Sequence, residues 1–423
     1  MLRLPMPPTI FISAGEASGE HYGALLIEAI KQQLGANGQS AAFFGMGGDR
    51  MAAAGLERIV RSEDMAVMGI TEVVRHLPRI YAEFRKLKQS IRDRRPDVAV
   101  LIDFPDIHFK LSAELHRLGV PVIFFVSPQL WAWKKRRIQL VQRYVDRMLV
   151  IFPFEQKFYL DRGVQAEFVG HPLAELPQPS ISREQFAREN HLEPGRTWIS
   201  LLPGSRPKEI RGNLPEMLKA AWNLTNLEQL ADREGKTHCE FAFLVPLAPT
   251  LTAEQRAEVL TLVEESGSGL DIRLVDDARA ALFHARASVV ASGTATVEAA
   301  LIGNPFVVVY RVSALTYSIA KRVVTVPHVA MANLIAGKRV VPELIQHDFT
   351  AQNIVQQLEP LLPDGTPRES MMQELQAIRR LLATGKPDTG GVIERVASIT
   401  LDELRAASPR IGVKDRLETT VQS

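Results

Sequence analysis

The sequence predicts an α/β protein built from two doubly wound domains. Buried-strand patterns alternate with helical patterns through both halves of the 423-residue chain. Each half opens with an apolar strand that stops at a glycine loop, at Thr9–Glu20 and again at Trp198–Arg211. A proline-rich stretch, Leu176–Ser180, separates the halves. Because such sheets bind ligands at the carboxyl ends of their strands, the glycine loops are the first candidate sites.

The composition is that of a globular chain without a dominant charge. Fifty basic residues against 48 acidic ones give a formal charge of +2, so no nucleic-acid partner is expected. The single cysteine, Cys239, excludes an internal disulfide and a cysteine zinc cluster, as is typical of a reducing cytoplasm. No apolar run approaches the ~20 residues of a membrane span. Glu16 and Glu20 stand where a signal peptide needs uncharged residues, so we expect a cytoplasmic protein.

The first domain begins with a strand at Ile10–Ile12, followed by a glycine loop that enters a helix. The loop lacks the GxGxxG spacing of dinucleotide-binding proteins. A second cluster, Gly45–Gly48, is followed by Arg50 where that fold requires its third glycine. NAD and FAD are therefore disfavoured, and no cofactor is expected.

The segment Glu72–Ile91 has apolar residues at helical spacing, although Pro78 is expected to kink or restart the helix. Cations fill the remaining positions: Arg75, Arg79, Arg85, Lys86, Lys88 and Arg92. Two interpretations stay open. The helix either packs on the core with a solvated basic face, or presents a basic amphipathic surface to anionic lipid.

Two carboxylates follow the continuous apolar strand Pro96–Ile102. Asp103 lies nearest the strand tip, where α/β enzymes place catalytic groups. Asp106 directly precedes a helical segment and suits an N-terminal helix cap. Asp103 is therefore the candidate for chemistry.

The next buried strand, Val120–Val126, leads to Trp131 and Trp133 beside the four cations Lys134–Arg137. Such a group can form a platform for a sugar or a phosphate. It can equally reflect helix packing, and the sequence leaves both alternatives open.

The second domain carries two strand-to-loop breaks suited to a nucleoside diphosphate. The first offers main-chain N–H groups and an arginine fork, and the second starts a helix whose free N–H groups can hold phosphate. Ordinary helix capping is the alternative for each break. The expected binding residues are Gly204, Ser205, Arg206, Ser292, Gly293, Thr294 and Glu298, with Arg311 and Asn333 along the same edge.

These patterns divide the chain into residues 1–175, 176–370 and 371–423. The last part reads as polar helices at Met371–Ala383 and Gly391–Leu404 with a frayed end. We expect these helices to pack back on an N-terminal domain.

Several motifs occur together in one order between residue 9 and about residue 345. They are Gly15–Gly19, Ala66–Ile70, Ile102–Asp106, Val126–Trp133, Gly170–His171, Leu202–Arg206, Ala291–Glu298 and Tyr310–Arg311. As a set they resemble the lipid-A-disaccharide synthase family. The resemblance implies a GT-B-type glycosyltransferase, in which two Rossmann-like doubly wound domains face each other across a cleft.

The resemblance implies an inverting transfer of 2,3-diacylglucosamine from UDP to the 6-hydroxyl of 2,3-diacylglucosamine 1-phosphate. The implied partners are UDP-2,3-diacylglucosamine, the acceptor phosphate and the inner membrane surface, which the protein would meet peripherally from the cytoplasm. A homodimer is compatible with the sequence. No metal is expected, because the nucleotide domain has no DxD-like pair of carboxylates.

The resemblance also assigns roles to residues. Asp103 becomes the general base, with Glu16 in the same catalytic group, and Arg206 binds the diphosphate. The residues expected on the acceptor or membrane side are Ser18, Met68, Arg79, Arg85, Lys86, Trp131 and Trp133. The sequence departs from the family pattern at Glu20, His108 and Ala332.

Two other functions remain as alternatives. A UDP-sugar 2-epimerase of the same fold also needs carboxylates opposite a UDP site, but it has no use for acyl pockets. A regulator that binds nucleotide sugars without chemistry would keep Arg206 and Glu298 and would not need Asp103.

Overall fold

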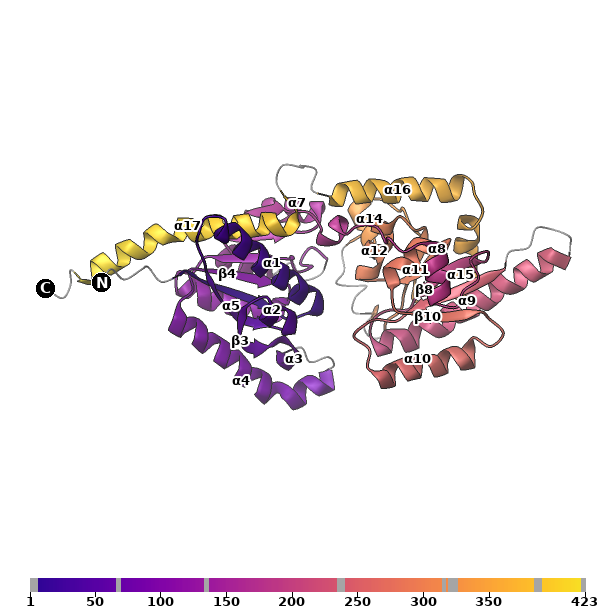
Figure 1. Cartoon of the computed structure of the whole chain (residues 1–423), viewed down its shortest axis with the longest axis horizontal. Helices are drawn as coiled ribbons and strands as arrows, with labels where there is room; N and C mark the ends of the chain where they lie inside the picture. The colour runs from indigo at the N-terminus through magenta and orange to yellow at the C-terminus, as the bar shows by residue number, and fades with distance from the viewer. Residues whose placement is uncertain are drawn as a thin grey trace. The chain divides into compact units, whose positions relative to one another are not determined.

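The computed structural model describes residues 7–65, 70–132, 137–233, 240–313, 317–318, 326–383 and 390–419. Side chains are described for all of these except 70–77, 228–233 and 407–419. The chain forms two compact α/β units (Figure 1). Unit 1 comprises Met1–Glu175 with Leu382–Ser423, and unit 2 comprises Leu176–Leu381. The predicted class, with two doubly wound parallel-sheet domains, is confirmed.

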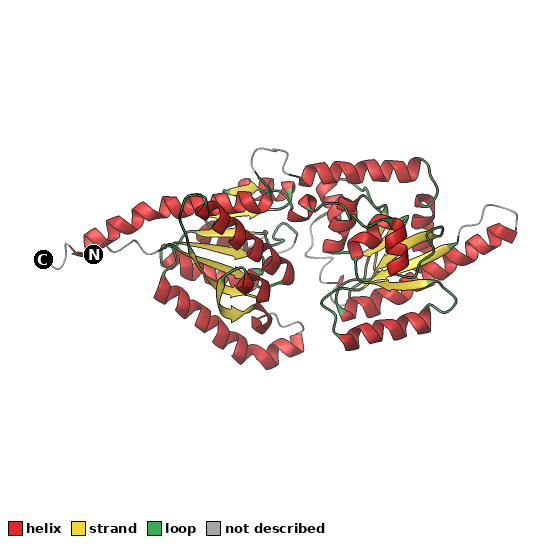
Figure 2. Cartoon of the chain, viewed as in Figure 1, coloured by secondary structure: helices red, strands yellow, loops and turns green. Residues whose placement is uncertain are grey.

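Unit 1 is organised around a seven-stranded parallel sheet in the order β3-β2-β1-β4-β5-β6-β7. Its strands are β1 (Thr9–Ala14), β2 (Ala42–Gly47), β3 (Leu56–Arg61), β4 (Val98–Ile102), β5 (Val122–Phe125), β6 (Arg147–Val150) and β7 (Ala166–Phe168). All five residues of β4 are buried, as expected for a central strand covered on both faces. Figure 2 shows helices on both sides of these strands.

The connections of unit 1 are mostly helical. They are α1 (Ala17–Gly35), α2 (Asp49–Ala53), α3 (Ser62–Met65), α4 (Ile70–Arg94), α5 (Pro105–Arg117), α6 (Ile138–Tyr144), α7 (Pro153–Leu160) and the 3₁₀ turn η2 (Pro172–Glu175). Helix α4 continues through Pro78 without restarting. Its residues Leu87 and Ile91 are buried, and Ile80 and Phe84 pack partly against the same core. The apolar side of this helix therefore packs on the core, and the role of its exposed basic face stays open.

Unit 2 repeats the plan with a six-stranded parallel sheet in the order β10-β9-β8-β11-β12-β13. Its strands are β8 (Thr197–Leu202), β9 (Phe241–Pro246), β10 (Ile272–Val275), β11 (Ala287–Ala291), β12 (Phe306–Tyr310) and β13 (Glu343–Ile345). Its helices are α8 (Arg183–Glu189), α9 (Pro207–Arg233), α10 (Ala253–Ser266), α11 (Ala278–His284), α12 (Thr294–Ile302), α14 (Met331–Ala336), α15 (Ala351–Leu358), η3 (Glu359–Leu361) and α16 (Thr366–Leu382).

The C-terminal residues are divided between the units. Helix α16 runs across residue 371, where the sequence predicted a boundary, and nearly all of it belongs to unit 2. The last helix, α17 (Val392–Thr419), returns to unit 1 and packs along α1 (Figure 1). Gln33 Nε2 on α1 donates to the Glu394 carbonyl oxygen at 3.0 Å. Helix α17 reaches Thr419, whereas the sequence predicted a frayed end.

Candidate active site

Strands β1 and β4 meet at the centre of the unit 1 sheet, where the strand order reverses direction. Their register pairs Ala14 with Ile102, so the loop at Gly15 and the turn at Asp103 leave the sheet side by side. Doubly wound sheets bind ligands at this switch point. The predicted acidic residues of unit 1 thus share one edge.

The Asp103 side chain lies on an unusual turn. Asp103 and Phe104 have φ values of 52° and 55°, in the left-handed region that few non-glycine residues adopt. The Phe104 N–H donates to Asp103 Oδ1 at 2.8 Å. Burial, and then the negative charge of Glu16, raise the pKa of Asp103 to about 6 against the effect of that N–H. A carboxylate with this pKa suits proton abstraction near neutral pH.

His108, on α5, contacts the main chain of the same turn. It is fully buried, and burial lowers its pKa to about 3, so the ring is neutral. Its Nδ1 contacts the Asp103 carbonyl oxygen, which can only accept a hydrogen bond. Nε2 therefore accepts from Ser13 Oγ at 2.8 Å. The His108 ring therefore holds the main chain of Asp103.

The glycine loop after β1 is shaped by the same turn. A Cβ on Gly15 would lie 2.3 Å from Cγ of Phe104, so only glycine fits under that ring. Glu16 and Ser18 follow at the exposed start of α1. Glu20 Oε1 accepts the Arg50 N–H at 2.9 Å, which joins the loop to the second glycine cluster.

Unit 2 has an equivalent switch point between β8 and β11. Val290 pairs with Leu202, so the loops Pro203–Arg206 and Ser292–Thr294 emerge beside each other. The helices α9 and α12 begin directly after these loops, with their free N–H groups at the same edge. Two neighbouring helix starts at a switch point form a suitable site for a diphosphate.

A carboxylate already contacts the donors of the first loop. Glu209 Oε2 accepts the N–H groups of Ser205 and Arg206 at 3.2 and 3.4 Å. The Arg206 guanidinium contacts Glu209 Oε1 at 3.4 Å and is 58% exposed. Gly204 has φ of 120°, and a Cβ there would lie 2.5 Å from Glu209 Oε2. The loop thus holds an anionic group on the atoms that a phosphate would use.

Glu298 lies in the first turns of α12, near the second loop. Within the described part of the chain, no hydrogen bond reaches its half-buried carboxylate. Burial raises the pKa of Glu298, Arg279 opposes this rise, and Asp277 adds to it. An unoccupied carboxylate beside a phosphate loop suits a ribose hydroxyl.

Arg311 and Asn333 differ in how accessible they are. Arg311 follows β12, is exposed, donates to the Phe349 carbonyl oxygen and lies 4.4 Å from the centroid of that ring. Asn333 is fully buried. Its Oδ1 accepts the Val340 and Val341 N–H groups, and its Nδ2 donates to Glu343 at 2.8 Å. Its amide is used within the fold, so Asn333 orders main chain rather than offering a free polar atom.

Among the acceptor-side cations on α4, two form ion pairs with neighbouring acids. Arg79 pairs with Asp64 at 2.7 Å, and Lys86 lies 3.9 Å from Glu83. Arg85 is exposed and lies 6.0 Å from the centroid of Tyr81, which is itself 61% exposed. Met68 and Trp133, together with Lys134–Arg136, lie outside the described residues.

Neighbouring cations of α4 converge on one buried acid. Glu114 pairs with Lys88 and Arg92 at 2.8 Å each and with Arg117 at 2.5 Å. The hydrogen bond from Arg92, with those from the other cations, holds the pKa of Glu114 far below its usual range. Part of the predicted basic face is therefore neutralised.

Trp131 is buried, at 7% exposure. Its ring packs edge-to-face on Phe154 with centroids 5.0 Å apart, and its Nε1–H donates to Glu155 Oε1 at 3.0 Å. A buried ring has no face to offer a sugar. The structure therefore favours the packing alternative for Trp131.

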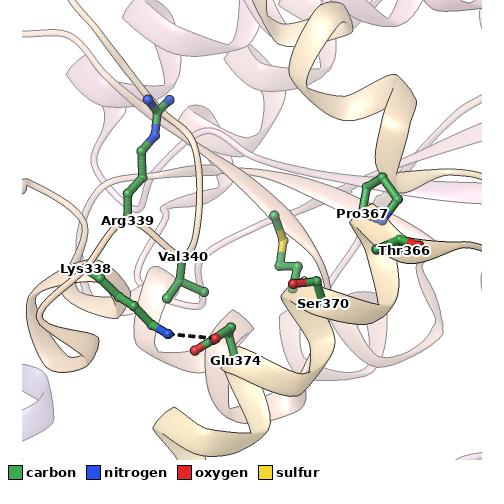
Figure 3. A pocket seen from close by; sticks show the side chains of 8 residues that line it. Lys338, Arg339, Val340, Thr366, Pro367, Ser370 and Glu374 are labelled. Carbon is green, nitrogen blue, oxygen red and sulfur yellow. Dashed lines mark hydrogen bonds and ion pairs between the residues drawn. The ribbon is translucent and has the colours of Figure 1, made fainter.

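A pocket of about 390 Å³ opens elsewhere on unit 2, beside the start of α16 (Figure 3). Its walls are Lys338, Arg339, Val340, Thr366, Pro367, Ser370, Met371 and Glu374. Lys338 Nζ lies 2.7 Å from Glu374 Oε1, so these lining charges satisfy each other. Neither phosphate loop, Pro203–Arg206 or Ser292–Thr294, lines this pocket. The pocket is therefore not part of the candidate site.

Two absences concern the described residues alone. Among them, no three acidic, histidine or cysteine side chains are placed to share a metal ion. In the same part of the chain, no helix combines the length and the apolar character needed to cross a membrane.

The two parallel sheets, each with glycine loops at its switch point, place the chain among proteins of the GT-B fold. Solved structures agree: MurG of Acinetobacter baumannii has a TM-score of 0.52 at 15% identity, covering 94% of this chain and all of that one. The calicheamicin glycosyltransferase CalG4 has a TM-score of 0.55 at 17% identity, covering 96% of this chain and 99% of that one. At these identities the likeness shows the fold alone.

The chain belongs to the lipid-A-disaccharide synthetase family, whose model matches residues 10–391. A lipid-A-disaccharide synthase of Acidobacterium capsulatum is 59% identical over 413 residues, which are 96% of this chain and 99% of that protein. Another, from Koribacter versatilis, is 46% identical over 93% of this chain and 97% of its own length. The resemblance stated from the motifs is confirmed.

Sequence reasoning did not single out Phe104, Glu209 or Glu155. Glu209 lies three residues after Arg206, at the third position of the helix. A glutamate at this position often accepts hydrogen bonds from main-chain N–H groups before the helix, which is a sequence signal for its contact with the loop. The fit of Phe104 over Gly15 joins residues 89 positions apart, so no local pattern indicates it.

Proposed function

We propose that this protein transfers 2,3-diacylglucosamine from UDP to the 6-hydroxyl of 2,3-diacylglucosamine 1-phosphate, giving a β-1,6 disaccharide and UDP. Family membership supports the substrates. The observation that carries the chemistry is the half-buried Asp103 carboxyl at the unit 1 switch point, with its pKa raised to about 6. A non-catalytic regulator would have no use for such a group.

In the proposed reaction Asp103 takes the proton of the acceptor 6-hydroxyl. The oxygen then forms a bond to the anomeric carbon as the bond from that carbon to the diphosphate breaks, and the electron pair leaves with UDP. Inversion follows because the hydroxyl attacks the face opposite the leaving group. The raised pKa keeps Asp103 largely ionised above pH 6 and still basic enough to accept the proton.

The leaving diphosphate requires positive and polar groups in unit 2. We assign this role to the Ser205 and Arg206 N–H groups, the Arg206 guanidinium and the start of α12. Glu209 would release these donors as the diphosphate arrives. Glu298 would accept from a ribose hydroxyl, Arg311 would contact the donor, and Asn333 would act through the main chain that it orders.

UDP release distinguishes the proposed function from its alternatives. We expect UDP only when both the diacyl donor and the diacyl phosphate acceptor are present. Isomerised UDP-sugar without acceptor would instead indicate the epimerase. Donor binding with neither product would indicate the regulator.

Activity should persist in a chelator such as EDTA. The reason is that helix starts and Arg206 are placed to stabilise the leaving charge, as in other anion sites built from main-chain N–H groups. The measurement is the initial rate with and without chelator, followed by added Mg²⁺. A rate that falls to the background in chelator and returns with Mg²⁺ would contradict the proposed mechanism.

We further propose that the protein meets its acyl substrates as a peripheral protein through the exposed face of α4. Tyr81, Arg85 and Lys86 are exposed there, and the ion pair of Lys86 with Glu83 is long, at 3.9 Å. Cations near an anionic bilayer attract it, and this attraction fades as salt shortens the Debye length.

The double variant Arg85→Ser/Lys86→Ser should bind anionic vesicles about tenfold more weakly at low salt, measured by cosedimentation. The matched control is Arg143→Ser/Lys157→Ser, which removes two exposed cations from other helices of unit 1. Equal binding by both double variants would show that the membrane contact lies elsewhere.

A further inference from the structure

The segment 126–132, which follows β5, is held by hydrogen bonds to side chains of α7. The Trp131 indole N–H donates to Glu155 Oε1 at 3.0 Å, and Glu155 Oε2 accepts the Phe152 N–H at 3.2 Å. At the other end of the segment, Ser127 Oγ and the Tyr159 hydroxyl are 2.9 Å apart. Glu155 is 1% exposed and Tyr159 is fully buried, so these bonds form away from solvent.

The same segment begins beside the candidate base. Phe125 pairs with Ile102, and the Asp103 N–H donates to the Phe125 carbonyl oxygen at 3.0 Å. The next residue, Val126, has φ of 64°, which is rare for a β-branched side chain. Such a conformation persists only where the surroundings enforce it. The Val126 N–H donates to the Leu149 carbonyl oxygen at 3.1 Å, and the hydrogen bonds to α7 hold the residues that follow.

We propose that the Trp131–Glu155 hydrogen bond is a positioning pair that holds segment 126–132 as the wall of the acceptor site beside Asp103. The proposal rests on the proposed function, because it concerns the acceptor of that reaction. It gives Trp131 a role that its buried ring allows. The residue acts through the main chain it anchors and does not touch the sugar.

The chemistry of the pair suits a fixed wall. Burial raises the pKa of Glu155 to about 8, so the carboxyl is mostly neutral at pH 7. A neutral hydrogen bond avoids the large cost of burying a charge. Removing one partner leaves the other buried and unsatisfied, which penalises the segment's native position.

Trp131→Phe tests the proposal, because phenylalanine keeps an aromatic ring against Phe154 and lacks the N–H donor. We expect the KM for the diacyl phosphate acceptor to rise about tenfold while the KM for the UDP donor stays within about twofold. Glu155→Leu should reproduce this split. Glu155→Gln should largely avoid it, because its amide oxygen still accepts from Trp131.

The matched control is Trp198→Phe in unit 2. Trp198 is fully buried, and its Nε1–H donates to the Glu193 carbonyl oxygen at 3.1 Å. This variant loses an equivalent indole hydrogen bond and should keep the parent's acceptor KM. Thermal melting of both variants measures how much stability each has lost.

An unchanged acceptor KM in Trp131→Phe would overturn the proposal. So would an equal rise in both KM values, or the same rise in Trp198→Phe, since each indicates general loosening. If Trp131→Phe does not fold, two other variants decide. Ser127→Ala, which loses the hydrogen bond to Tyr159, should raise the acceptor KM, whereas Glu155→Gln should leave it near that of the parent. UDP release by the parent protein tests the proposed function. The ratio of the acceptor KM of each variant to that of the parent tests the positioning pair.

Discussion

Asp103→Asn should reduce turnover by about 10²–10⁴-fold while UDP binding stays close to that of the parent. The amide cannot accept the acceptor's proton, and Asp103 lies in unit 1, whereas the phosphate loops lie in unit 2. Initial rates and UDP titration calorimetry measure the two effects. A loss of turnover below about tenfold in folded protein would exclude the role of general base.

Asp106→Asn is the matched control for Asp103→Asn. Asp106 lies on the same turn, is 68% exposed and pairs with Arg137 at 2.6 Å. Its substitution removes a neighbouring carboxylate and leaves Asp103 in place, so turnover should change by less than about threefold.

The pH profile provides a second readout of the same carboxyl. Because only ionised Asp103 accepts a proton, kcat/KM should fall as pH decreases through about 6. The negative charge of Glu16 raises the pKa of Asp103, so Glu16→Gln should move this acid limb to lower pH. A limb that moves upward, or stays in place, would contradict the electrostatic effect of Glu16 on Asp103.

Arg206→Ala should lower kcat by about 10²–10³-fold, the usual loss when one group that stabilises leaving charge is removed. UDP affinity should also fall, because the guanidinium is proposed to contact the diphosphate in both the bound and the reacting state. Binding of uridine, which carries no phosphate, should not change. Single-turnover rates and calorimetry separate these effects.

Arg211→Ala is the control for Arg206→Ala. The two side chains are 59% and 58% exposed, and Arg211 pairs with Glu258 on α10 instead of facing the loop. Near-parent activity in both variants would remove Arg206 from the mechanism. Equal losses in both would point to a general effect of charge.

The sequence predicts the central strands and their loops well, for a physical reason. β4 and β8 are buried on both faces, so their apolar runs are continuous and stop at the residues that leave the sheet. The candidate residues Asp103 and Arg206 follow directly from those ends. The edge strands β3 and β13 were not predicted, because β3 is partly exposed and rich in charged residues and β13 has only three residues.

The environment of a side chain was harder to predict than its place in the chain. Trp131 follows an expected strand and Asn333 was expected at the edge of the nucleotide loops, yet each is buried and hydrogen-bonded within the fold. Their partners, Glu155 and Glu343, come from later elements. Hydrogen bonds between separate elements depend on tertiary packing, and the spacing of apolar residues along the sequence does not indicate which elements pack together.

The return of α17 to unit 1 has a consequence during synthesis on the ribosome. This helix buries Val392, Val396 and Ala397, and it packs against α1. The rest of unit 1 emerges roughly 200 residues earlier, which at ~5–20 residues per second is about 10–40 s of translation. Throughout that interval the apolar side of α1 has no covering helix. We therefore expect the nascent chain to expose apolar surface of the kind that chaperones bind until α17 has emerged.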